Sequence, residues 1–211
     1  MTNIIEQIRT IGIVPVIAIS DANGAVPLAQ ALKAGGLPCA EVTFRTAAAA
    51  DAIRQIKTHV PDVLIGAGTI LSSEQADTAI NAGAQFLVSP GFNPKVVAHC
   101  REKNYHIVPG CATPSDMEAA LEMGLTLVKF FPAEQAGGLA YIKAVAAPYA
   151  ALSFLPTGGI GPKNLAEYLS FPRIVACGGS WMASKDLIDA GDFATIERLS
   201  REAAEIVRSQ R

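Results

Sequence analysis

Short apolar runs alternate with amphipathic segments along most of the chain. Each apolar run is followed by Gly, Pro, Ser, Asn or Thr and then by a helical pattern such as Ala47–Thr58 or Ser73–Ala82. The runs predict eight strands, at Ile13–Ile19, Cys39–Phe44, Val63–Ile70, Phe86–Ser89, His106–Gly110, Leu127–Phe131, Ser153–Pro156 and Val175–Gly178. The first strand begins at 13 and the eighth at 175, so the seven intervals average about 23 residues.

The two ends of the chain add one helix each to this repeat. Isoleucines at helical spacing predict a first helix over Thr2–Thr10, and Phe193–Arg208 is amphipathic with Glu197 and Arg201 four residues apart. Eight strand–helix units favour a (β/α)₈ TIM barrel with an extra N-terminal helix over an open doubly wound sheet. No linker or low-complexity stretch interrupts 1–211, so we expect a single barrel domain. Glycines in the left-handed conformation are expected to end several helices, at Gly35-Gly36, Gly83 and Gly124.

Composition and charge narrow the classes of partner. The 211 residues are 50% hydrophobic with a net charge of −2, and no basic run indicates nucleic acid. Residues 1–7 carry acid and amide side chains where a signal peptide is basic and then apolar. No apolar run approaches the roughly 20 residues of a membrane span. The four cysteines are widely spaced without a CxxC pair, which predicts buried thiols in a reducing, cytoplasmic compartment.

Lys129 stands in the middle of the apolar run Leu127–Phe131. Alternation along a strand places Leu127, Lys129 and Phe131 on one face. Lysine is seldom fully buried, because burial disfavours the charged form of its amine at a cost that packing alone rarely justifies. The pattern therefore indicates a nucleophilic amine that forms a Schiff base with a carbonyl. A lysine that extends to the strand end, or that pairs with a buried carboxylate, is the alternative.

Other polar side chains occur at the carboxyl ends of the predicted strands, where barrels place their active sites. Glu41, Thr43 and Arg45 share a face at the end of the second strand, and Thr69 follows the third. Taken alone, Glu41 and Arg45 are typical of a structural ion pair. With Lys129 they supply what a Schiff-base enzyme acting on a 2-keto acid needs, namely an amine, a general acid/base and a cation for the carboxylate.

Glycine-rich turns follow the seventh and eighth strands, at Thr157–Pro162 and Gly178–Trp181. Glycines let backbone N–H groups approach an anion, and these two positions are a frequent phosphate site in barrels. Glycine also serves simple turn geometry, so either turn alone is weak evidence. The segment Gly66–Gly68 lacks the third glycine of a dinucleotide motif, and no Walker sequence occurs.

The three histidines do not predict a metal centre. His59 and His99 fall in predicted outer helices, and His106 begins the fifth strand at the opposite end of the barrel. None has ligand spacing with another histidine or a cysteine, and no Ser–His–acid set is evident. We therefore expect chemistry without a metal ion.

Seven motifs now point to a family. In order and spacing they resemble the bifunctional 2-keto-3-deoxy-6-phosphogluconate (KDPG) / 4-hydroxy-2-oxoglutarate (KHG) aldolases nearly from end to end. Phe44 and Met182 stand where this family has leucine or a similar residue, which are conservative changes. The motifs are Glu41–Thr46, Gly66–Thr69, Ser89–Gly91, Pro109-Gly110, Lys129–Glu134, Pro156–Ile160 and Gly178–Trp181, the first and fifth being the most specific.

The resemblance implies a class I, metal-independent aldolase without a cofactor, on a (β/α)₈ barrel and usually a homotrimer. It implies Lys129 as the Schiff-base lysine and Glu41 as the general acid/base that takes the C4 hydroxyl proton as the C3–C4 bond breaks. Its binding residues would be Arg45 and Thr69 for the pyruvate carboxylate, Phe131 and Thr157 along the site, and Gly158, Gly159, Gly179 and Ser180 for the 6-phosphate.

The expected reactions are cleavage of KDPG to pyruvate and glyceraldehyde 3-phosphate, and of KHG to pyruvate and glyoxylate. The similar phosphogalactonate aldolases share the lysine and the glycines but lack an arginine at the position of Arg45, which favours the phosphogluconate branch. Two alternatives remain, a phosphosugar isomerase or epimerase and a non-catalytic phosphometabolite-binding barrel. The first would need no lysine, and the second would form no imine.

Overall fold

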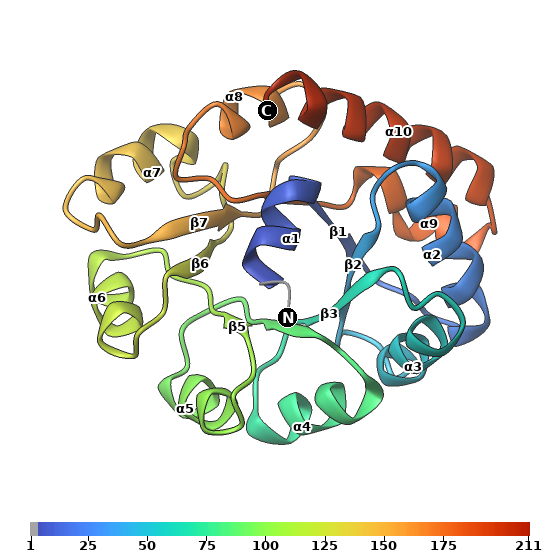
Figure 1. Ribbon diagram of the computed structural model, residues 1–211, viewed down its shortest axis with the longest axis horizontal. Helices are drawn as coiled ribbons and strands as arrows, with labels where there is room; N and C mark the ends of the chain where they lie inside the picture. The colour runs from blue at the N-terminus through green and yellow to red at the C-terminus, as the bar shows by residue number, and fades with distance from the viewer. Residues whose placement is uncertain (1–3) are drawn as a thin grey trace.

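Parallel strands form a closed barrel in the computed structural model, which describes residues 4–211 (Figure 1). β5, β4, β3, β2, β1 and β8 pair in that order, and β6 pairs with β7. Parallel bridges between Gly110 and Lys129 and between Thr157 and Gly178 join the two sheets at both edges. The predicted eight-stranded barrel is therefore confirmed. The strands are β1 Ile13–Ile17, β2 Cys39–Thr43, β3 Leu64–Gly68, β4 Phe86–Val88, β5 Ile107–Val108, β6 Leu127–Phe130, β7 Ser153–Pro156 and β8 Cys177–Gly179.

Helices surround the barrel in a ring that α10 completes beside α2 (Figure 1). The predicted first helix is present from Ile4, while its expected start at Thr2 lies outside the described residues. None of the helices in residues 4–211 has the length and apolarity of a bilayer-spanning segment. The helices are α1 Ile4–Ile11, α2 Ala25–Ala34, α3 Ala49–His59, α4 Ser73–Ala82, α5 Pro94–Glu102, α6 Pro114–Glu122, α7 Gly138–Ala146, α8 Leu165–Leu169, α9 Lys185–Asp189 and α10 Phe193–Ser209.

Two apolar cores follow from the alternation of side chains along each strand. One lies inside the barrel and includes Leu127 and Leu155, and the other lies between the barrel and the helices and includes Val128 and Phe130. Ile8 of α1 belongs to the inner core, and α1 crosses the middle of the ring of strands in Figure 1. The extra helix thus closes the amino-terminal end of the barrel, and the opposite end stays available for a site.

Several strands are shorter than the sequence predicts. β3 was expected to reach Ile70 but ends at Gly68, because Thr69 takes a left-handed backbone with φ of 60° and leaves the ladder. β8 begins at Cys177 instead of Val175. The glycine expectation at the end of α2 was wrong for Gly35, which has φ of −74°. Gly35 instead lets α10 approach, since a Cβ there would lie 2.4 Å from the Cβ of Ser200.

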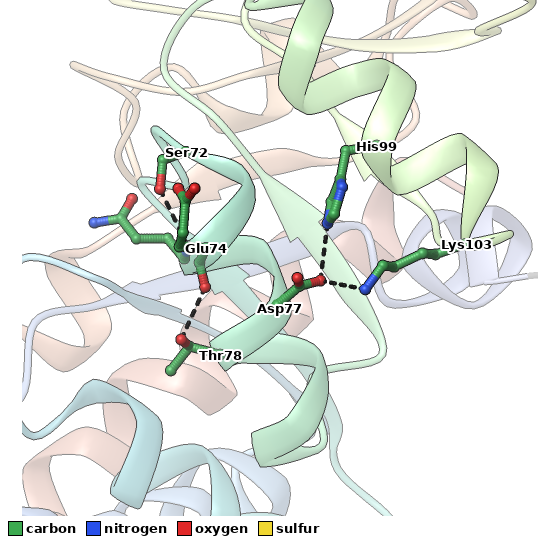
Figure 2. Close-up of polar contacts among 7 residues, drawn as sticks. Ser72, Glu74, Asp77, Thr78, His99 and Lys103 are labelled. Carbon is green, nitrogen blue, oxygen red and sulfur yellow. Dashed lines mark hydrogen bonds and ion pairs between the residues drawn. The ribbon is translucent and has the colours of Figure 1, made fainter.

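A polar cluster on the outer surface links α4 to α5 (Figure 2). Asp77 Oδ1 accepts a hydrogen bond from Lys103 Nζ at 2.7 Å and lies 2.8 Å from His99 Nε2. The hydrogen bond from Lys103, and then the contact with His99, lower the pKa of the Asp77 carboxyl. This carboxyl is therefore predicted to stabilise the fold in a pH-dependent way.

Asp77→Asn should lower the free energy of unfolding at pH 7, and the difference from the wild type should shrink in acid. Because the pKa of Asp77 is lower in the folded state, its contribution is fully present above about pH 4 and is lost as the pH falls through the folded-state pKa. Urea unfolding of both proteins at pH 7 and pH 3 measures the difference. An equal difference at the two pH values would contradict this assignment.

Candidate active site

Lys129 and Glu41 face each other inside the barrel. Lys129 is 6% exposed and Glu41 is fully buried, with 3.8 Å between Lys129 Nζ and Glu41 Oε1. That separation exceeds a direct N–H···O hydrogen bond. Lys129 Nζ also lies 5.1 Å from the centroid of the Phe131 ring. The amine therefore does not extend into solvent, and the carboxylate it meets is the predicted general acid/base.

Gly68 provides the space that the Glu41 carboxylate occupies. Glu41 pairs in register with Gly66, yet its Oε1 would lie only 2.0 Å from a Cβ on Gly68, two residues nearer the carboxyl end of β3. Both carboxylate oxygens are buried without a hydrogen-bond partner in residues 4–211. A buried polar atom without a partner is costly, and such groups concentrate at functional sites. The carboxylate is thus placed to act on a ligand.

The cysteine next to this pair is a neutral thiol. Burial raises the pKa of the Cys39 thiol far above its usual range, and the nearby Glu41 carboxylate raises it further. The thiolate is the nucleophilic form of cysteine, so Cys39 is not a competing nucleophile. All four cysteines are buried and free, as the sequence predicts.

A cavity of about 190 Å³ opens at the carboxyl ends of the strands. Phe131 connects it to the buried pair, since its ring lies beside the Lys129 amine. The Thr157 hydroxyl is buried without a hydrogen-bond partner in residues 4–211. The structure does not place Thr69 in the cavity wall. Seven of the predicted binding residues do line it, namely Arg45, Phe131, Thr157, Gly158, Gly159, Gly179 and Ser180.

Asn164 holds the glycine turn that follows β7. Its Oδ1 accepts a hydrogen bond from the N–H of Gly161 at 2.8 Å, and its Nδ2 donates one to the carbonyl of Gly159 at 3.1 Å. Gly158 and Gly159 have φ of 104° and 76°, a backbone conformation that glycine adopts without strain. The turn is therefore fixed before any ligand binds.

The histidines lie away from this cavity, as expected. His59 ends α3 and His99 is in α5, while His106 lines a cavity beside α1 at the amino-terminal end of the barrel. Within residues 4–211 no three His, Cys, Asp or Glu side chains are grouped so that they could hold a metal ion.

Comparison with known proteins assigns the chain to a family. Residues 4–199 match the family model described as KDPG and KHG aldolase. The chain belongs to the KDPG/KHG aldolase family. A 2-dehydro-3-deoxy-phosphogluconate aldolase of Treponema pallidum (strain Nichols) is 52% identical over 98% of this chain and 99% of that protein. A KHG/KDPG aldolase of Escherichia coli (strain K12) is 43% identical over 95% of this chain and 94% of that protein.

Solved structures of KDPG aldolases have the same fold. The crystal structure of the Legionella pneumophila enzyme, with pyruvate captured at low pH as a covalent carbinolamine intermediate, superposes with a TM-score of 0.91. It is 36% identical and covers 95% of this chain and 98% of that chain. The predicted family is therefore confirmed for this chain, and so is the predicted enzyme type, a carbon–carbon lyase.

Three residues in the site of this KDPG/KHG aldolase were not predicted from the sequence, namely Thr43, Gly68 and Asn164. Thr43 was placed on the face shared by Glu41 and Arg45, and that alternation was the signal that could have identified it. The contact between Gly68 and Glu41 crosses from β3 to β2, and Asn164 bonds back to a turn several residues earlier. Neither relation leaves a local pattern in the sequence.

Proposed function

We propose that this protein is a class I aldolase that cleaves KDPG to pyruvate and glyceraldehyde 3-phosphate through an imine on Lys129. The observation that carries the proposal is a buried amine 3.8 Å from a buried carboxylate without hydrogen bonds, beside a cavity that Arg45 lines. The carbinolamine of pyruvate in the Legionella pneumophila relative supports it. The 52% identity to a phosphogluconate aldolase supports the choice of substrate.

In the first step, Lys129 in its amine form attacks the C2 carbonyl of the keto acid. Glu41 passes the proton that the carbinolamine oxygen needs, and loss of water leaves the iminium. Arg45 at the cavity rim binds the carboxylate beside C2, and Thr69 is the second proposed partner of that carboxylate. The left-handed backbone of Thr69, rare for a β-branched residue, supports a functional role there.

In the second step, Glu41 takes the proton of the C4 hydroxyl. The electrons of the C3–C4 bond move into the iminium to give an enamine, and glyceraldehyde 3-phosphate leaves. Protonation at C3 and hydrolysis of the resulting iminium then release pyruvate and restore the Lys129 amine. This hydrolysis consumes one water, which balances the water released in the first step. The iminium takes up the electron pair, which is why residues of this chain suffice for the bond cleavage.

The phosphate of KDPG is proposed to bind at the glycine turns that line the cavity. Gly158 and Gly159 follow β7, Gly179 ends β8 and Ser180 comes next, so backbone N–H groups and one hydroxyl reach the same space. This position matches the frequent phosphate site of barrels after strands 7 and 8.

Asn164→Ala should raise the KM for KDPG by about tenfold, because the turn must then be ordered when the phosphate binds. Pyruvate has no phosphate, so the pyruvate concentration that half-saturates imine trapping should not change. Ser170→Ala, which removes a hydroxyl at the other end of α8, is the matched control and should change neither value. An equal loss for KDPG and pyruvate would contradict this role of the turn.

KHG is the second proposed substrate, supported by the name of the Escherichia coli relative. KHG has no phosphate, so only the lysine, the carboxylate and the arginine would bind it. Pyruvate release from KDPG, the phosphogalactonate epimer and KHG, measured at equal concentrations, tests the proposed function. We expect KDPG to be cleaved fastest, and no pyruvate release from KDPG would overturn the proposal.

The homotrimer, the single domain over 1–211 and the cytoplasmic location remain predictions. Light scattering after size exclusion should give three times the mass of one chain. The four free thiols agree with a reducing compartment.

A further inference from the structure

Thr43, the last residue of β2, connects two parts of the structure through one hydroxyl group. Its Oγ1 donates a hydrogen bond to the carbonyl of Ile17 at 2.7 Å and accepts one from Arg45 Nε at 3.0 Å. A hydroxyl has a single proton, and the bond to Ile17 uses it. A lone pair of Oγ1 is therefore directed to Arg45. The Thr43 side chain is also held in place by its surroundings, because Thr43 is only 2% exposed.

Arg45 needs such a support more than Lys129 and Glu41 do. Arg45 is exposed on the rim and its side chain rotates about several bonds, whereas Lys129 and Glu41 are buried. Fixing a long exposed side chain costs conformational entropy, which weakens any ligand that must order it. The bond from Arg45 Nε to Thr43 orders the guanidinium before a substrate arrives.

We propose that Thr43 is a positioning residue that determines how Arg45 binds the substrate carboxylate. Because Nε donates to Thr43, the edge of the guanidinium that contains Nε is occupied and does not bind the carboxylate side-on. The two terminal nitrogens remain for a bidentate, end-on contact with the carboxylate. This inference rests on the proposed function, in which Arg45 binds the carboxylate of a 2-keto acid. It adds a residue that does not touch the substrate but acts through Arg45.

The chain contains a matched control for the structural part of this role. Thr46 Oγ1 donates to the carbonyl of Ile19 at 2.6 Å, so it also ties the end of β2 to the segment after β1. Unlike Thr43, it accepts no bond from Arg45. Thr46→Val therefore removes a similar link and leaves the Arg45 support intact.

Thr43→Val should raise the KM for KDPG and the half-saturating pyruvate concentration for imine trapping by about tenfold. The value of kcat should change far less, because Lys129 and Glu41 are not touched. Thr43→Ser keeps the hydroxyl and should restore both values, and Thr46→Val should match the wild type. Thr43→Ala is measured in parallel, so that a folding failure of the valine variant does not end the test.

The double variant with Arg45→Ala separates the inference from the proposed function. Thr43→Val should add nothing to the KM increase that Arg45→Ala causes alone. If Arg45→Ala leaves the KM unchanged, the proposed carboxylate contact fails. Two results would overturn positioning by Thr43 and leave the proposed function standing. In the first, Arg45→Ala raises the KM but Thr43→Val does not. In the second, Thr43→Val raises the KM by the same factor in the Arg45→Ala background as in the wild type.

Discussion

Lys129→Ala is expected to abolish KDPG cleavage, with kcat/KM lower by about 10⁴-fold or more. The amine is the proposed nucleophile, and the neighbouring Cys39 is held as a neutral thiol that does not replace it. Pyruvate release from KDPG, followed over a wide range of enzyme concentration, measures the loss. Lys143→Ala on the exposed side of α7 is the matched control and should retain full activity.

The same substitution leaves Glu41 buried without its cation, so the fold is expected to lose stability as well. Lys129→Met also removes the cation but fills more of the space, so it should lose less stability than Lys129→Ala. It should remain folded and still be inactive. An active Lys129→Met protein would show that another group performs the chemistry.

Substitution at Glu41 has the second largest expected effect. Glu41→Gln should lower kcat for KDPG by about 10²- to 10⁴-fold, because the amide does not take the C4 hydroxyl proton. Borohydride should still trap pyruvate on Lys129 in this variant, although more slowly. Complete loss of trapping, equal to that of the lysine variants, would contradict the separate roles of the two residues.

Gly68→Ala tests the same role without altering the carboxyl group. The added Cβ would lie 2.0 Å from Glu41 Oε1, so the carboxylate must move away from its place beside Lys129. We expect kcat to fall in the direction of Glu41→Gln while the protein remains folded. Gly24→Ala is the control, since a Cβ there meets its nearest atom at an ordinary 3.8 Å. A fully active Gly68→Ala protein would show that the position of Glu41 is not critical.

Periodicity and end-of-strand chemistry explain why so much could be predicted from sequence. The repeat of apolar runs gave the barrel, and alternation about Lys129 placed Leu127 in the inner core and Val128 in the outer core. Chemistry-bearing residues at the carboxyl ends of strands then converge in any barrel of this type, which brought Glu41 and Lys129 together.

Relations that depend on the third dimension could not be read from the chain. The early end of β3 results from the left-handed backbone of Thr69, a conformation that a threonine does not signal. Gly35 does end α2, but with φ of −74° and not in the expected left-handed conformation, and a glycine is required there by the approach of α10. The hydrogen bonds of Thr43 with Arg45 and of Asn164 with the glycine turn depend on side-chain directions that only packing decides.

Cleavage requires that the Lys129 amine itself bonds to the keto acid. Peptide mapping by mass spectrometry after borohydride reduction in the presence of pyruvate detects this bond. We expect a stable pyruvate adduct on the peptide that contains Lys129, together with loss of KDPG cleavage in proportion to the modified fraction. An unmodified Lys129 peptide under conditions that inactivate the enzyme, or an adduct on another lysine, would contradict it.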